Sequence, residues 1–157
     1  MTINTVSNQL IQLNILTEKE EVKLEFLLDN WIKEAPQEKG RKKSKDIILG
    51  VFKNDTYLNL AWQGFDSFPN IFFGNLLCLT KLHLDQNNLI DLPISIKYLD
   101  VLKELDLGSN QLKTLPADLF CNLLQLTKLS LHNNHIETLP DDLFNMVDSP
   151  LKILQLS

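Results

Sequence analysis

One pattern of leucines recurs along the C-terminal part of the chain. The segment LTKLHLDQNNLIDLP starts at Leu79 and returns as VLKELDLGSNQLKTLP and LTKLSLHNNHIETLP, with a degenerate copy, TYLNLAWQGFDSFP, before them and a fragment, LKILQLS, after them. Leu79, Leu102, Leu126 and Leu151 keep one register, at spacings of 23, 24 and 25 residues. Repetition at such a period indicates a coil in which each unit buries its apolar side by stacking on its neighbours.

The pattern resembles the leucine-rich repeat, in which apolar residues at fixed offsets precede an Asn and a later Leu-Pro. The resemblance implies a short right-handed α/β solenoid with a parallel sheet on its concave face. Asn87, Asn110 and Asn134 occupy the Asn position, and Gln63 replaces it in the first copy. Because stacking buries backbone polar groups, we expect these amides to bond to the backbone of adjacent turns.

Phenylalanines recur on the predicted convex side of the coil. Phe73, Phe120 and Phe144 share one offset after the Phe-Pro or Leu-Pro pair, and Lys97 occupies that offset in the remaining repeat. We expect the three aromatic rings to form an inner spine.

The chain divides into a cap and a repeat region. Residues 1–54 are predicted to form a lead-in and a helical cap, and residues 55–157 four repeats plus a terminal strand. A capping box of Thr17 and Glu20 begins the first helix, and Pro36 ends it. A second helix is predicted over 44–52. The cap should cover the first repeat, because an end repeat otherwise exposes its core.

Composition excludes several classes of function. The net charge of −5 disfavours generic nucleic-acid binding, and no run of about 20 apolar residues could span a membrane. Cys78 and Cys121 lie nearly two repeats apart, or roughly 10 Å at about 4.8 Å per strand, which is too far for a disulfide. We expect two thiols packed in turns, in a protein of a reducing compartment.

Strand segments are predicted at 57–61, 81–85, 104–108 and 128–132, each with two inward leucines and outward residues between them. In a parallel coil the outward residues of successive repeats form rows. The rows are Tyr57, Lys81, Glu104 and Lys128; Asn59, His83, Asp106 and Ser130; and Ala61, Asp85, Gly108 and His132.

We expect these rows, apart from Ala61 and Gly108, to form a protein-binding face together with Trp62, since solenoids bind through the concave side. Tyr57 and Trp62 are the candidate aromatic anchors. Two alternatives compete with this interpretation. The row of Lys81, Glu104 and Lys128 could serve only to neutralise its own charges across strands, and Trp62 could seal the joint between cap and repeats.

Nothing in the sequence predicts catalysis, a metal or a cofactor. His83 and His132 lie two repeats apart, too far to hold one metal ion without other ligands. His83 near Asp85 or Asp106 could suggest acid–base chemistry, but no nucleophile, oxyanion hole or glycine-rich phosphate loop accompanies it. The basic run 39–45 is interpreted as a solvated linker, with a nuclear import signal or an anionic-membrane contact as alternatives.

The cap and first repeat together resemble a bacterial arrangement. WIKEAP, a charged linker and DIILGVFKNDTYLNLAWQGFDSFP are similar to the start of the leucine-rich-repeat effectors of the invasion-plasmid-antigen-H type, ubiquitin ligases that Gram-negative pathogens inject into host cells. The matching positions are Trp31, Glu34, Arg41, Ile47, Leu49, Phe52, Leu58, Leu60, Phe65, Phe68 and Pro69. The resemblance implies a module that a bacterium secretes into the host cytoplasm and that binds a host protein; without secretion the module would be cytoplasmic.

The repeats depart from that family in length, and its Cys-x-Asp nucleophile is absent, since Asn122 and Leu123 follow Cys121. An alternative is therefore the substrate-recognition fragment of a larger ubiquitin-ligase-type effector whose catalytic domain is missing. A third hypothesis concerns the open edge of the terminal strand, which could pair with a second copy to give a homodimer.

Overall fold

The computed structural model describes residues 29–30, 56–68, 73–143 and 151–156. Asp29 and Asn30 are helical. The rest of the two predicted cap helices, the joint that the cap would make with the first repeat, and Phe144 lie outside the described residues.

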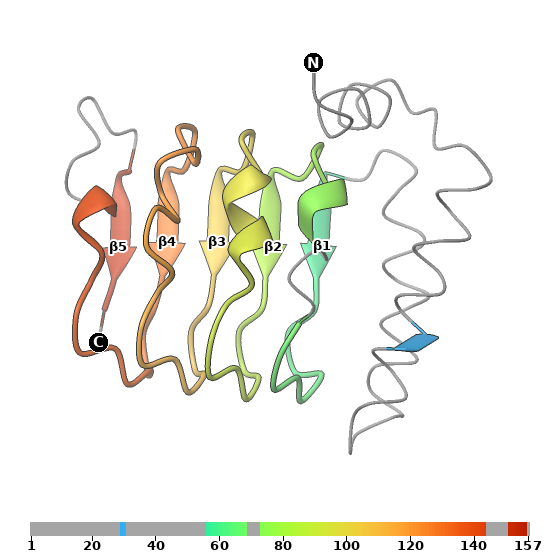
Figure 1. The fold of residues 1–157 in the computed structure, drawn as a ribbon, viewed down its shortest axis with the longest axis vertical. Helices are drawn as coiled ribbons and strands as arrows, with labels where there is room; N and C mark the ends of the chain where they lie inside the picture. The colour runs from blue at the N-terminus through green and yellow to red at the C-terminus, as the bar shows by residue number, and fades with distance from the viewer. Residues whose placement is uncertain (1–28, 31–55, 69–72, 144–150, 157) are drawn as a thin grey trace.

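Five short strands form one parallel sheet in the order of the sequence (Figure 1). They are β1 (Tyr57–Asn59), β2 (Lys81–His83), β3 (Glu104–Asp106), β4 (Lys128–Ser130) and β5 (Ile153–Gln155). Each repeat thus contributes one strand and each strand pairs with the next, so the described repeats form the predicted parallel-strand solenoid. The strands are shorter than the predicted segments, although backbone bonds such as Leu60 N–H to the His83 carbonyl (2.8 Å) continue the pairing beyond β1.

Short 3-10 helices lie on the convex side of the solenoid, opposite the rows of outward-pointing strand side chains. They are η1 (Phe73–Asn75), η2 (Ile94–Tyr98) and η3 (Asp141–Leu143). The Leu-Pro pairs start η2 and η3, because a proline carbonyl accepts the N–H three residues later. Ile96 N–H bonds to Pro93 (3.1 Å) and Leu143 N–H to Pro140 (3.1 Å). Proline fixes its own φ and needs no donor there, so it starts a tight turn at little cost.

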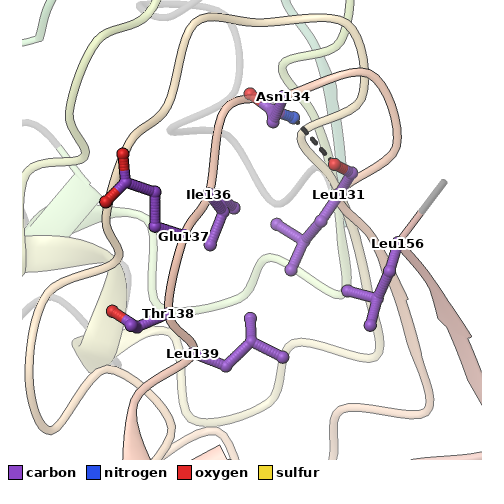
Figure 2. Close-up of a pocket in the computed structure, with 7 residues that line it drawn as sticks. All are labelled: Leu131, Asn134, Ile136, Glu137, Thr138, Leu139 and Leu156. Carbon is purple, nitrogen blue, oxygen red and sulfur yellow. Dashed lines mark hydrogen bonds between the residues drawn. The ribbon is translucent and has the colours of Figure 1, made fainter.

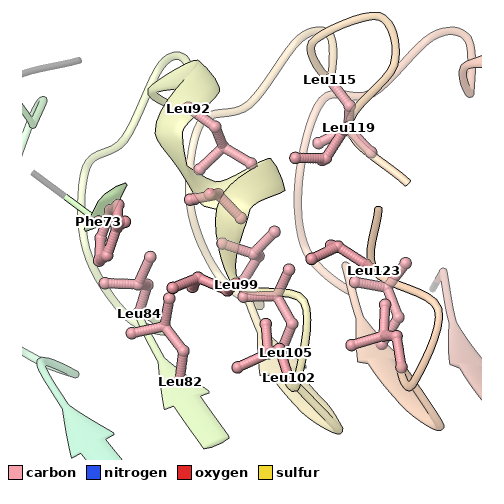
Figure 3. Close-up of a cluster of buried hydrophobic side chains, with 14 of the residues drawn as sticks. Phe73, Leu82, Leu84, Leu92, Leu99, Leu102, Leu105, Leu115, Leu119 and Leu123 are labelled. Atoms are coloured by element: carbon pink, nitrogen blue, oxygen red, sulfur yellow. The ribbon is translucent and has the colours of Figure 1, made fainter. Parts of the chain in front are cut away.

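The core is a stack of leucines between the sheet and the convex segments (Figure 3). Leu58, Leu82, Leu105 and Leu129 follow one another in register through the strands, and each is fully buried. A buried Leu contributes about 1.5–3 kcal/mol, and no single turn could bury its own leucines without neighbours. Phe73 and Phe120 are also fully buried, as predicted for the spine.

Buried asparagines join each turn to the one before it. Asn110 is 5% exposed; its Oδ1 accepts the Leu89 N–H (3.1 Å) and its Nδ2 donates to the Leu84 carbonyl (3.0 Å), both in the preceding turn. A second bond from Nδ2 reaches Leu107 in its own turn (3.0 Å). Asn87 and Asn134 make equivalent bonds, which confirms the predicted role.

Replacing Asn110 by Ala should therefore destabilise the solenoid by about 1–3 kcal/mol, because it leaves the Leu89 N–H unpaired and removes one of the two donors to the Leu84 and Leu107 carbonyls. Urea unfolding followed by circular dichroism measures this. Lys113→Ala, an exposed substitution in the same turn, should change the free energy of unfolding by less than about 0.5 kcal/mol. Equal stability of the two variants would contradict the role of Asn110.

Candidate protein-binding face

The outward side chains of the strands lie in the predicted rows. Tyr57, Lys81, Glu104 and Lys128 are direct partners across β1 to β4, and so are Asn59, His83, Asp106 and Ser130. The third row follows from backbone bonds beyond the strands, including Trp62 N–H to the Asp85 carbonyl (3.2 Å). We call the surface formed by these rows the sheet face.

Glu104 is the centre of an ion-pair network on the sheet face. Its Oε1 accepts a hydrogen bond from Lys128 Nζ at 2.6 Å, and its Oε2 lies 3.5 Å from Lys81 Nζ. The side chain of Glu104 is 17% exposed, against 55% for Lys81 and 38% for Lys128. The expected neutralisation across strands is therefore present, and it leaves this row with one positive charge in excess.

The network shifts the pKa of both partners of the short bond. The hydrogen bond from Lys128 lowers the pKa of Glu104 below its ordinary value of 4.5, with burial acting in the opposite direction. The same bond raises the pKa of Lys128. Both side chains thus stay charged and oriented toward each other at neutral pH.

His83 lies between Tyr57 and Glu104. Its Nδ1 is 3.4 Å from the Tyr57 hydroxyl, and the two rings meet edge to face with centroids 5.2 Å apart. Its Nε2 is 3.4 Å from Glu104 Oε1 and, within the described part of the chain, is buried without a hydrogen-bond partner. The imidazole therefore lies against both the Tyr57 ring and the carboxylate of Glu104.

Gly108 makes room for a side chain from the next turn. The His132 ring lies over it, and a Cβ on Gly108 would stand 2.0 Å from the His132 Cε1. His132 Nδ1 is held at 2.8 Å from the Ser130 hydroxyl. The absent side chain of Gly108 therefore decides where the imidazole lies on the sheet face.

A column of residues with left-handed backbone conformation borders the sheet face; the sequence places these residues beside the third row but does not predict the conformation. Trp62, Gln86, Ser109 and Asn133 occupy equivalent places in four turns, with φ between 52° and 61°. This conformation costs a residue with a side chain about 1–2 kcal/mol. Only Asn is a residue type that commonly adopts it, so the sequence carried a weak signal.

Trp62 is 74% exposed and Tyr57 45%. The alternative role of Trp62, a seal between cap and repeats, stays a prediction, because that joint lies outside the described residues. The two thiols differ from expectation, since Cys78 and Cys121 are exposed rather than packed.

A hollow opens beside the last described strand (Figure 2). Its volume is about 360 Å³, and its lining includes Leu131, Ile136, Leu139 and Leu156. Leu156 is 53% exposed, whereas Leu131, one turn earlier, is 2% exposed. The hollow therefore lies at the last described turn of the leucine stack.

Among the residues that the structure describes, no three His, Cys, Asp or Glu side chains are grouped so as to hold a metal ion. Within the same residues, no helix has the length and apolar character that crossing a bilayer requires. His83 and His132 lie on different turns, two strands apart.

Comparison with known proteins identifies the repeats. Residues 78–136 match the family model described as leucine rich repeat. Keratocan from Gallus gallus and keratocan from Coturnix japonica are each 31% identical over 126 residues, covering 78% of this chain and 32% of theirs. The chain thus spans about a third of the length of these curated relatives.

Solved leucine-rich repeat structures share the fold. A Shigella effector domain aligns with a TM-score of 0.65 at 25% identity, covering 83% of this chain and 53% of its own. The leucine-rich repeat domain of APL1B aligns with a TM-score of 0.62 at 30% identity, covering 73% and 34%. A chain of the LRIM1/APL1C complex gives 0.61 at 33% identity, covering 64% and 19%.

Gly108→Ala should destabilise the protein by about 1–3 kcal/mol and displace the His132 ring, since the new methyl overlaps it. Unfolding in urea and the NMR shifts of the His132 ring protons measure the two effects. Gly74→Ala is the matched control, because its Cβ would meet Tyr98 at an ordinary 3.8 Å. An unmoved His132 signal in Gly108→Ala would contradict the overlap.

Glu104→Gln should lower the free energy of unfolding at pH 7 by about 0.5–1 kcal/mol, a modest value because the lysines are partly exposed. The folded-state pKa of Glu104 is lowered, so its contribution is complete above the unfolded pKa and disappears as pH falls through the folded pKa. The difference between wild type and variant, measured by urea titrations from pH 7 to pH 3, should therefore shrink in acid. A constant difference would contradict the assignment.

Proposed function

We propose that this leucine-rich repeat protein binds another protein through the sheet face. The observation that carries the proposal is the alignment of outward side chains from four consecutive turns in register. Their backbone is held by stacked strands, and Lys128 and Lys81 are oriented by Glu104. A surface ordered before binding loses little conformational entropy on association, which supports its use as a recognition site.

The proposed contact residues combine aromatic groups at one end with mixed charges at the centre. Tyr57 and Trp62 offer large exposed rings, which are favoured as interface anchors. A partner that fits would present an acidic group to the excess charge of Lys81 and Lys128, and a basic group to Asp85 and Asp106. The full proposed set is Tyr57, Asn59, Trp62, Lys81, His83, Asp85, Glu104, Asp106, Lys128, Ser130 and His132.

Charge reversal tests this role. The double variant Lys81→Glu/Lys128→Glu should weaken binding of a partner isolated with the wild-type chain at least tenfold, or about 1.4 kcal/mol, because the row changes from net positive to net negative. Surface plasmon resonance against the purified partner measures it, at two salt concentrations. Lys113→Glu adds a negative charge away from the sheet face and serves as control. Unchanged affinity of the double variant would exclude the sheet face.

We further propose that the chain acts as a bacterial effector in the host cytoplasm, by itself or as the recognition part of a larger ubiquitin ligase. The similarity to a Shigella effector leucine-rich repeat domain and the sequence of the cap support this setting. The keratocans are proteins of birds and lend it no support. Transfer of a full-length reporter fusion into host cells by a secretion-competent strain tests it; a fusion retained by the bacterium contradicts it.

A second candidate function is self-association at β5. Leu154 and Leu156, in or beside the last strand of the described sheet, are 36% and 53% exposed, and pairing with a second copy would cover them. Sedimentation equilibrium at high micromolar concentration should then show a dimer, and Leu154→Lys should abolish it. A monomer in both proteins would remove this candidate.

A further inference from the structure

The left-handed column contains one residue, Trp62, whose position is not explained by a contribution to the stability of the fold. Trp62 has φ 61°, a conformation that is rare for a bulky side chain, and it is 74% exposed. Its ring therefore gains little burial to offset either the backbone strain or the contact of the indole with water. A glycine would satisfy the same turn without strain. Strain of this kind, held in place by the surrounding turns, is a pointer to a binding role.

Uncharged side chains continue from Trp62 along the solenoid axis. Gln86, Ser109 and Asn133 occupy the same place in the next three turns, and Asn88 and Gln111 lie two residues later in two of them. We call these five residues the amide strip. Neither the left-handed column nor the positions two residues later contain Lys, Arg, Asp or Glu. The rows of the sheet face beside them, in contrast, are charged.

Hydrogen bonds orient the amide strip from turn to turn. Asn133 Nδ2 donates to Ser109 Oγ at 3.3 Å, and Gln111 Nε2 donates to Asn88 Oδ1 at 3.5 Å. These bonds are long and lie at exposed positions, so a ligand can replace them at little cost. The Gln86 side chain has no hydrogen bond within the described part of the chain, so its donor and acceptor are available to a ligand.

We propose that Trp62 and the amide strip bind an extended, neutral oligosaccharide. A side-chain amide presents a donor and an acceptor side by side, which suits neighbouring sugar hydroxyls that both donate and accept. The C–H face of a pyranose is apolar and flat enough to stack on an exposed indole, which offers a large apolar surface. The absence of charge from the strip selects against anionic and cationic ligands.

The spacing of the turns favours a saccharide over a peptide. Successive strands lie about 4.8 Å apart, a distance comparable with the advance of one ring in an extended sugar chain. An extended peptide advances about 3.3 Å per residue, so its side chains come into step with the turns of the solenoid only at every third residue. A β-1,4-linked chain of hexopyranose rings, which is straight and flat, therefore fits the strip best.

NMR titration of the full-length protein with cellohexaose and chitohexaose tests the proposal. The Trp62 indole N–H should shift in a saturable manner with at least one of them, while the indole of Trp31, the other tryptophan, stays fixed. Maltohexaose, a curved chain of the same size, should bind at least tenfold more weakly. Absence of a saturable Trp62 shift with both β-1,4-linked hexasaccharides would overturn the proposal.

Substitutions of Gln86 and of Tyr57 separate this site from the sheet face, since Trp62 belongs to both proposed surfaces. Trp62→Ala should weaken saccharide binding at least tenfold, Trp62→Phe less, and Gln86→Ala about threefold, while Tyr57→Ala and Lys113→Ala leave it unchanged. Trp62→Gly should be at least as stable as wild type, which shows that lost binding is not lost folding. Undiminished binding by Trp62→Ala would overturn the proposal, as would tighter binding of an uncharged Gly-Ser-Gln peptide at the same resonances.

Discussion

The solenoid depends on hydrogen bonds that buried asparagines make between turns. Stacking leucines supplies the driving force but is not directional, so leucines alone would not set the register of one turn on the next. Asn87, Asn110 and Asn134 each accept a backbone N–H of the preceding turn and donate to its carbonyl. Because a buried unpaired group is costly, a turn that slipped in register would lose several bonds at once.

Register in turn creates the two surfaces with proposed roles. The same stacking that aligns the leucines inside aligns Lys81, Glu104 and Lys128 outside, close enough for ion pairs. It also repeats a left-handed residue three positions after each of β1 to β4, which places Trp62 at the head of an uncharged strip. Charged rows and amide strip lie side by side but differ in the chemistry they can recognise, so each can be altered without the other.

Much of this arrangement could be predicted from the sequence, and the failures have physical causes. The rows were correct because strand alternation and a constant repeat register leave few alternatives. The sequence left open whether Trp62 is an exposed anchor or a seal for the joint with the cap, because a large aromatic side chain suits both roles. The left-handed conformation of the column was not predicted, because a tight turn imposes φ on whatever residue it contains. The sequence did not indicate the role of Gly108, because the space that this glycine leaves is filled by the ring of His132 from another turn.

The sequence by itself determined the repeat, the identity of the core, and which residues share a face. Periodicity decides these properties, because leucine, asparagine and proline each have one physical role per turn. Only the tertiary structure decided which neighbours actually touch: the 2.6 Å bond from Lys128 to Glu104, the imidazole of His83 between a phenol and a carboxylate, and the exposure of Trp62. Those contacts depend on side-chain directions between turns, which no local pattern encodes.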